Sequence, residues 1–106
     1  MKKAEEQILR AIATKARNVM PKDATIMLYG SRARGDNRKD SDWDLLILLN
    51  KEKVTLNDID EVEYPLRELG WSIGQDINPV LYTNKEWNEN SFTPFYKNVT
   101  EDCIIL

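Results

Sequence analysis

The sequence predicts an α/β (α+β) fold, in which a small mixed sheet of three to four strands is flanked by helices. Helical spacing of apolar residues recurs in two separate segments. The run DLLILL, residues 44–49, has no polar alternation, which is typical of a strand covered on both faces. The expected helices and strands also alternate along the chain. At 106 residues, the chain has the length of one domain, so we expect residues 1–106 to form a single domain.

The first helix is expected over residues 3–20. Its apolar residues recur on one stripe, as an amphipathic helix requires: Ile8, Ile12, Ala16 and Val19. Pro21 ends this helix, because proline disfavours the helical conformation in the residue before it. The segment ATIMLYG, residues 24–30, follows as a short buried strand that ends at a glycine.

The second half of the chain begins with a polar connection and a capping box, Thr55 with Asp58. The helix that follows keeps its apolar spacing in Ile59, Val62, Leu66 and Leu69. Pro65 should kink or split it, since proline removes one backbone hydrogen bond. Residues 76–83 predict a third strand, and Pro79 places that strand at an edge or a bulge.

The remaining elements are short. Residues 84–87 suggest a brief helix. Thr93 and Pro94 form an N-cap and first-turn pair for a last helix that runs to about Glu101. Residues 104–106 are apolar and predict a final short strand.

Composition excludes several kinds of chemistry. The net charge of −3 gives no global attraction to nucleic acid or to an anionic membrane. The chain has no histidine, so histidine-dependent triads and zinc sites are excluded, and its single cysteine cannot form an intrachain disulfide. Glu5 and Glu6 stand where a signal peptide would need an apolar run. We therefore expect a cytoplasmic protein without a membrane segment.

The stretch GSRARGDNRKDSDWDLLIL, residues 30–48, carries the strongest functional signal. On an extended chain, Asp42 and Asp44 point to the same side, with Trp43 opposite. Two like charges beside an apolar strand repel each other, which favours a bound cation between them. Magnesium suits this role because it binds carboxylate and phosphate oxygens together.

Three other interpretations of this stretch compete with a magnesium site. A solvated acidic turn is the simplest, since most charge clusters are of that kind. A calcium loop beginning at Asp40 would need glycine and glutamate where Leu45 and Lys51 stand. A P-loop would need lysine and a hydroxyl residue after Gly35, where the sequence has aspartate and asparagine. The last two patterns are therefore rejected.

The residues around the turn suit a polyphosphate. Gly30 permits close backbone approach, and the Ser31 hydroxyl and nearby amides can bind phosphate oxygens. Arg32 and Arg34 can offset phosphate charge, although a solvated helix face explains them equally well. A third carboxylate is then expected from a neighbouring strand, and Asp76 is the candidate, with a plain turn aspartate as the alternative.

Ser31, ten residues, and then Asp42-Trp43-Asp44 match the signature GSx10DxD. The chain thereby resembles the nucleotidyltransferase superfamily that includes DNA polymerase beta. Over nearly its whole length, it is similar to the minimal nucleotidyltransferases, the antitoxins of HEPN/MNT modules.

The resemblance implies roles for the residues of the site. It implies that Gly30 and Ser31 contact ATP and that Asp42, Asp44 and Asp76 bind two magnesium ions. Asp76 would also help to deprotonate the acceptor. The family usually has an apolar residue before the third acid, where this chain has Gln75.

The resemblance also implies a function. It points to transfer of AMP from ATP to a tyrosine of a helical HEPN toxin, with no direct binding of nucleic acid. Two alternatives stay open: nucleotidyl transfer to a small molecule, and a non-catalytic nucleotide-binding module that neutralises its partner by contact. Either could involve a homo- or hetero-oligomer.

Overall fold

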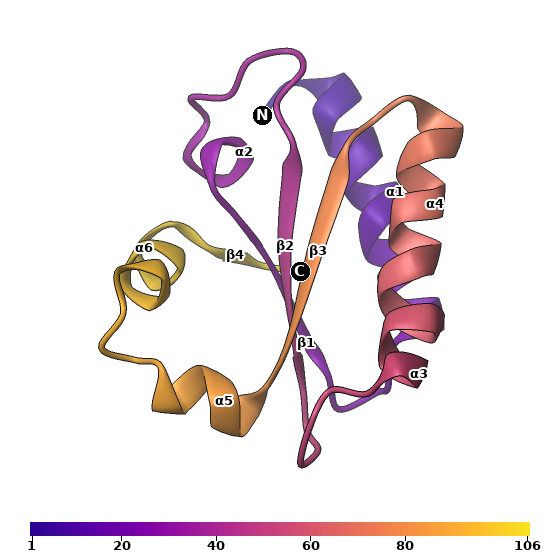
Figure 1. Cartoon of the computed structure of the whole chain (residues 1–106). Helices are drawn as coiled ribbons and strands as arrows, with labels where there is room; N and C mark the ends of the chain where they lie inside the picture. The colour runs from indigo at the N-terminus through magenta and orange to yellow at the C-terminus, as the bar shows by residue number, and fades with distance from the viewer.

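The computed structural model describes all residues 1–106 and has the predicted architecture, a mixed sheet with helices on both faces (Figure 1). The four strands are β1 (Thr25–Tyr29), β2 (Trp43–Leu49), β3 (Ile77–Thr83) and β4 (Ile104–Ile105). Their order is β3-β2-β1-β4. β1 pairs antiparallel with β2 and β4, whereas β2 and β3 are parallel.

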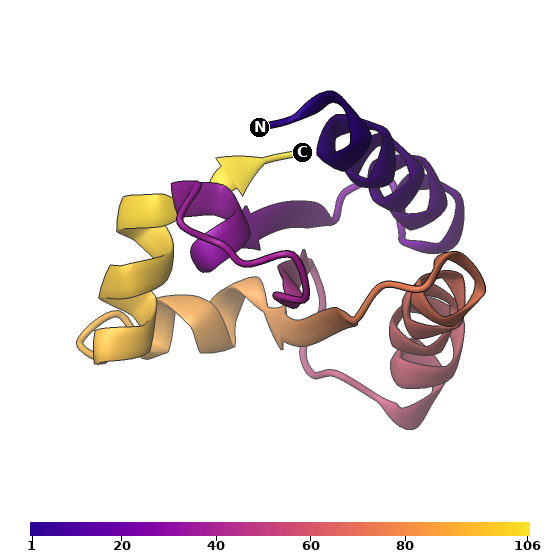
Figure 2. The ribbon, with the colours of Figure 1, turned by 90° about the horizontal axis from the view of Figure 1, so that it is seen from above.

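The helices form two groups on opposite faces of the sheet. α1 (Lys3–Val19) and the segment α3 (Leu56–Asp58), η1 (Ile59–Glu63) and α4 (Tyr64–Ile73) cover one face. α5 (Asn84–Glu89) and α6 (Pro94–Asp102) cover the other, as the view from above shows (Figure 2). The short α2 (Ser31–Arg34) lies at the end of the sheet where β1 finishes. No helix is long and apolar enough to span a bilayer.

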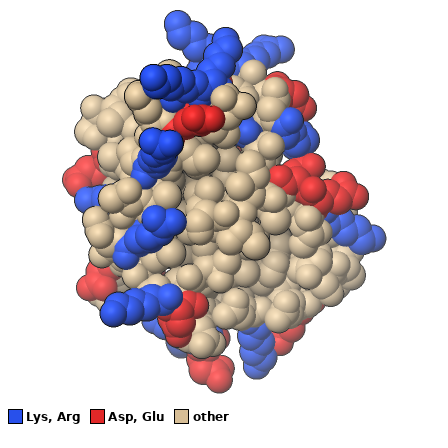
Figure 3. Space-filling view, turned by 180° about the vertical axis from the view of Figure 1, so that it is seen from behind, with Lys and Arg blue, Asp and Glu red and all other residues tan.

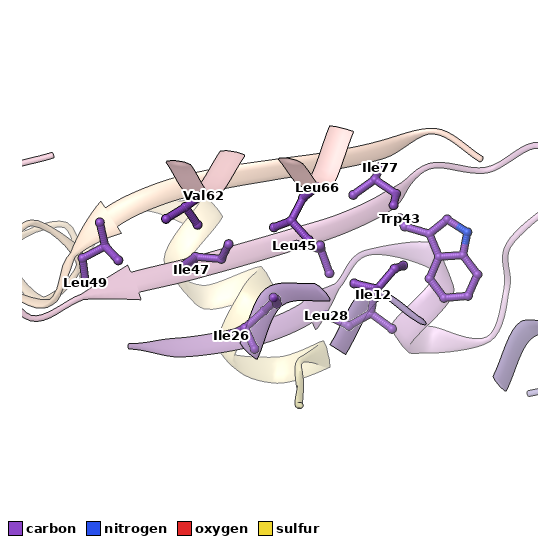
Figure 4. Packing of buried hydrophobic residues seen from close by; sticks show 11 residues of the cluster. Ile12, Ile26, Leu28, Trp43, Leu45, Ile47, Leu49, Val62, Leu66 and Ile77 are labelled. Atoms are coloured by element: carbon purple, nitrogen blue, oxygen red, sulfur yellow. The ribbon is translucent and has the colours of Figure 1, made fainter. Parts of the chain in front are cut away.

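β2 is buried on both faces, as its unbroken apolar run predicted. Leu45, Ile47 and Leu49 pack toward the α1–α4 side, where Val62 and Leu66 meet them (Figure 4). Leu46 and Leu48 pack on the other side, against residues of α5 and α6. This alternation decides the direction of Asp44, which shares the parity of Leu46 and so lies on the α5–α6 side of the sheet.

Pro65 has the predicted effect on its helix. The turn before it, η1, is a π-helix, in which the amide of Tyr64 bonds to the carbonyl of Ile59. The helix then resumes as α4, with Pro65 in its first turn, where a missing amide proton is tolerated. Pro79 lies in β3, an edge strand, also as predicted.

Candidate functional site

The turn between β1 and α2 is built around Gly30. Its φ of 77° and ψ of −158° lie in a region that glycine alone adopts readily. A Cβ atom added here would lie 2.6 Å from Oδ2 of Asp44. The absent side chain thus allows the backbone to approach the carboxylate directly, and the first residue of α2, Ser31, follows at once. The Gly-Ser turn and Asp44 are therefore neighbours.

Asp44 lies in a row of polar side chains that crosses three strands. It pairs with Tyr29 on β1 and with Asn78 on β3. Nδ2 of Asn78 donates a hydrogen bond of 3.3 Å to Oδ1 of Asp44. Burial, together with the negative charges of Asp44 and Tyr82, raises the pKa of Tyr29 to about 12. Asn78 was not among the predicted site residues, although strand alternation places it on the face of Asp76, two residues earlier.

The pKa of Asp44 is raised above its ordinary value. Burial is the largest cause. The hydrogen bond from Asn78 opposes it, the charge of Asp42 raises the pKa further, and the charge of Arg34 lowers it. Asp42 is exposed and lies two residues before Asp44 on the same side of the chain. The two carboxylates therefore repel each other at a half-buried position, where a cation would relieve the repulsion.

Asp76 lies directly before β3, and its side chain is exposed. Its backbone carbonyl accepts a hydrogen bond of 2.8 Å from the amide of Trp43, which aligns it beside the strand that carries the other two acids. No three Asp, Glu, His or Cys side chains are gathered closely enough to hold a metal ion. Asp42 and Asp44 act on each other electrostatically, whereas the expected set of three carboxylates stays a prediction.

The donor chemistry at Asp42 and Asp44 fits magnesium. The two groups supply hard carboxylate oxygens, which Mg²⁺ prefers. The missing Cβ of Gly30 leaves room beside Oδ2 of Asp44. The repulsion between the acids also means that a divalent cation would be bound with a gain in electrostatic energy.

The two arginines of α2 have different surroundings. Arg34 is exposed and forms ion pairs with Asp36 at 3.2 Å and with Asp102 at 3.1 Å. The side chain of Arg32 is only 4% exposed, and its guanidinium contacts protein groups rather than solvent. A solvated helix face, one of the two interpretations of Arg32, is therefore wrong. Its burial follows from a partner far away in sequence, Glu5.

Basic side chains gather at the end of the molecule where α1 begins (Figure 3). The exposed lysines and arginines of the N-terminus and of the loop before β2 are Lys2, Lys3, Arg38 and Lys39. A hollow of about 950 Å³ lies between α1, α2 and β4, and Lys2, Arg34 and Ile104 are among its lining residues. None of the three predicted acids lines this hollow. The local surface is thus positive, although the whole chain carries a charge of −3.

Two solved structures have a similar fold. A crystal structure of a toxin–antitoxin with AMP-PNP superposes with a TM-score of 0.65 at 20% identity, over 91% of this chain and 69% of that chain. A crystal structure of a mutant MntA–HpeT toxin–antitoxin gives a TM-score of 0.58 at 20% identity, over 96% of this chain and 70% of that chain. At this identity, the likeness establishes the fold.

Sequence relationships define the family. A protein of Methanocaldococcus jannaschii named "Putative protein adenylyltransferase MJ0604" is 31% identical over 104 residues, which are 98% of this chain and 95% of that protein. The sequence model of the nucleotidyltransferase domain matches residues 6–106. The chain therefore belongs to the nucleotidyltransferase domain family and is an enzyme of that class.

Proposed function

We propose that this chain is a metal-dependent protein adenylyltransferase that transfers AMP from ATP to a tyrosine hydroxyl of a helical HEPN toxin and thereby acts as its antitoxin. One observation carries the transfer chemistry: Gly30 brings the Gly-Ser turn against Asp44, beside Asp42. The relative named as a protein adenylyltransferase and the toxin–antitoxin structures of similar fold support the protein acceptor.

In the proposed reaction, the acceptor oxygen attacks the α-phosphorus of ATP. The bond between that phosphorus and the oxygen bridging to the β-phosphate breaks, and pyrophosphate leaves. The acceptor proton passes to a carboxylate, for which Asp76 is the proposed group. Gly30 and Ser31 would hold phosphate oxygens through backbone amides and a hydroxyl. The exposed Arg34 would offset charge on the leaving pyrophosphate.

Magnesium would be held by Asp42 and Asp44, with Asp76 as the proposed third ligand. When bound, two such ions neutralise phosphate charge and favour the ionised acceptor. The protein's own contribution is to hold Asp44 against the Gly-Ser turn, with Asp42 two residues earlier on the same side of the chain. Asn78 supports this by donating to one oxygen of Asp44, which fixes the direction of the other.

The decisive experiment is intact-mass spectrometry of the product of the neighbouring gene after co-expression with this chain. We expect the toxin to gain one or more AMP masses with the wild type and none with Asp42→Asn or Asp44→Asn. Asp40→Asn is the matched control, because Asp40 is an exposed aspartate of the same loop and occupies an unspecified position in the ten-residue spacer of the signature. Peptide mapping should place the modification on tyrosine.

Other outcomes would point elsewhere. Neutralisation of the toxin by Asp42→Asn and Asp44→Asn as well as by the wild type, without a mass gain, would contradict the proposal and favour a binding module. Turnover of ATP with a small-molecule hydroxyl in the absence of any partner protein would favour the small-molecule transferase.

A further inference from the structure

Arg32 is a buried cation in a small protein, and its contacts account for every nitrogen of its guanidinium. Nη1 donates to Oε2 of Glu5 at 3.2 Å. Nε and Nη2 donate to the carbonyl of Ser41 at 3.2 and 3.0 Å, and Nη2 also donates to the carbonyl of Lys39 at 3.1 Å. Buried ion pairs add little net stability, because desolvation offsets the attraction. These contacts therefore call for an explanation beyond stability.

The contacts of Arg32 converge on the residue before Asp42. Two of its nitrogens donate to the carbonyl of Ser41, whose own Oγ accepts a hydrogen bond of 2.8 Å from the amide of Arg38. The loop is thus fixed one residue before the carboxylate. The planar fork of arginine makes these parallel contacts, and the single ammonium of lysine cannot reproduce them.

The same guanidinium also touches the residue between the two acids. Its central carbon lies 4.5 Å from the ring centre of Trp43, a cation–π contact. Trp43 is fully buried and lies at the end of the core nearest this loop (Figure 4). Its Nε1 donates to Oε1 of Gln75 at 2.9 Å, and its amide donates to the carbonyl of Asp76. Gln75, which departs from the family pattern, thus links Trp43 to the third acid.

We infer that Arg32 is a positioning residue of the transfer site: through Ser41 and Trp43 it sets the places of Asp42 and Asp76 relative to each other. This inference rests on the proposed function, and it assigns Arg32 a role other than phosphate binding. Its guanidinium binds the protein on the Trp43 side of the strand, opposite to the side of Asp42 and Asp44. Glu5 of α1 balances its charge, so the first helix is part of the same arrangement.

The test compares Arg32→Lys with Arg10→Lys, a matched change at an exposed arginine of α1. Electron paramagnetic resonance measures free Mn²⁺ in the presence of AMP-PNP. After subtraction of the Mn²⁺ that AMP-PNP binds without protein, it gives the Mn²⁺ affinity of each variant. Hydrogen exchange of residues 36–43 reports the loop directly. We expect Arg32→Lys to fold and to exchange its amide hydrogens faster in this loop. It should also bind Mn²⁺ about 10-fold more weakly, because residues that hold metal ligands in place typically affect metal affinity by at least this factor. Arg10→Lys should match the wild type in both measurements.

The outcomes separate the inference from the proposed function. If the wild type binds Mn²⁺ with AMP-PNP and folded Arg32→Lys binds it equally well, Arg32 is only a structural brace and the inference fails alone. If the wild type binds neither Mn²⁺ nor AMP-PNP, the proposed function fails and this inference fails with it. Should Arg32→Lys not fold, Gln75→Met decides, because it removes only the acceptor for Trp43 at a half-buried position. Weaker Mn²⁺ binding would support the arrangement, and unchanged binding would overturn it.

Discussion

Replacing Gly30 by alanine tests the geometry on which the site depends. The backbone of Gly30 lies in a region that is essentially restricted to glycine, and a non-glycine residue there costs about 1–3 kcal/mol. The new methyl group would also lie 2.6 Å from Oδ2 of Asp44. That oxygen is the end of a short side chain, so the carboxylate would rotate away. The hydrogen bond from Asn78 would then be lost, at about 0.5–1.5 kcal/mol.

Together these effects predict a loss of about 2–4 kcal/mol in the free energy of unfolding for Gly30→Ala. For a domain of this size, each kcal/mol lowers the Tm by about 4–8 °C, so we expect a decrease of roughly 8–30 °C. Gly35→Ala is the control. Gly35 also has a positive φ, 85°, but no atom lies within 4 Å of an added Cβ. It should lose only about 1–2 kcal/mol from backbone strain.

Urea and thermal unfolding, followed by circular dichroism, would measure both variants. The same measurements on Asp44→Ala and on Gly30→Ala/Asp44→Ala complete a double-mutant cycle. Without the carboxylate, the added methyl group meets no obstacle, so the cost of Gly30→Ala should fall by about 0.5–1.5 kcal/mol. An equal cost of Gly30→Ala in the two backgrounds would refute the direct approach of Gly30 to Asp44.

Three further predictions concern ionisation and capping. The pKa of Asp44 is raised in the folded state, so the protein loses stability as the pH rises through that pKa and the buried carboxylate ionises. Asp44→Asn removes this ionisation and should therefore raise the Tm at pH 7, by an amount that shrinks toward pH 4. A gain in Tm that stays constant over this pH range would contradict the raised pKa. Asp44→Asn should also lower the pKa of Tyr29 from about 12, and an unchanged absorbance titration would count against their proximity. Thr55→Ala should cost about 1 kcal/mol, because Thr55 and Asp58 form a reciprocal capping box; thermal unfolding indistinguishable from the wild type would argue against that cap.

Local patterns in the sequence were sufficient for most of the fold. The stripe of the first helix, the buried run of β2 and the prolines at positions 21, 65 and 79 each act within a few residues of themselves, so their effects can be read from spacing. The same holds for the direction of Asp42 and Asp44, which strand alternation determines. The expected sheet of three to four strands is confirmed by the order β3-β2-β1-β4.

Pairings between distant segments could not be predicted in this way. Arg32 is buried because Glu5, 27 residues earlier, lies beside it in the fold. Gln75 matters because Trp43, 32 residues away, has a buried N–H group that needs an acceptor. Nothing in the local sequence around either residue indicates its partner. The second layer of the site, which holds the acids in place, is therefore visible only in three dimensions.

Two arginines that are two residues apart on α2 are suited to different tasks. The ion pairs of Arg34 are exposed, with the side chains of Arg34, Asp36 and Asp102 respectively 44%, 63% and 23% exposed. Exposed pairs contribute little to stability because water screens them, so a phosphate could replace either carboxylate at little cost. Arg32 is 4% exposed, and its release would leave Glu5 without its ion-pair partner and two loop carbonyls without the donor that Arg32 supplies. The difference in burial thus leaves the guanidinium of Arg34 accessible to solvent, whereas that of Arg32 is enclosed by the loop before β2.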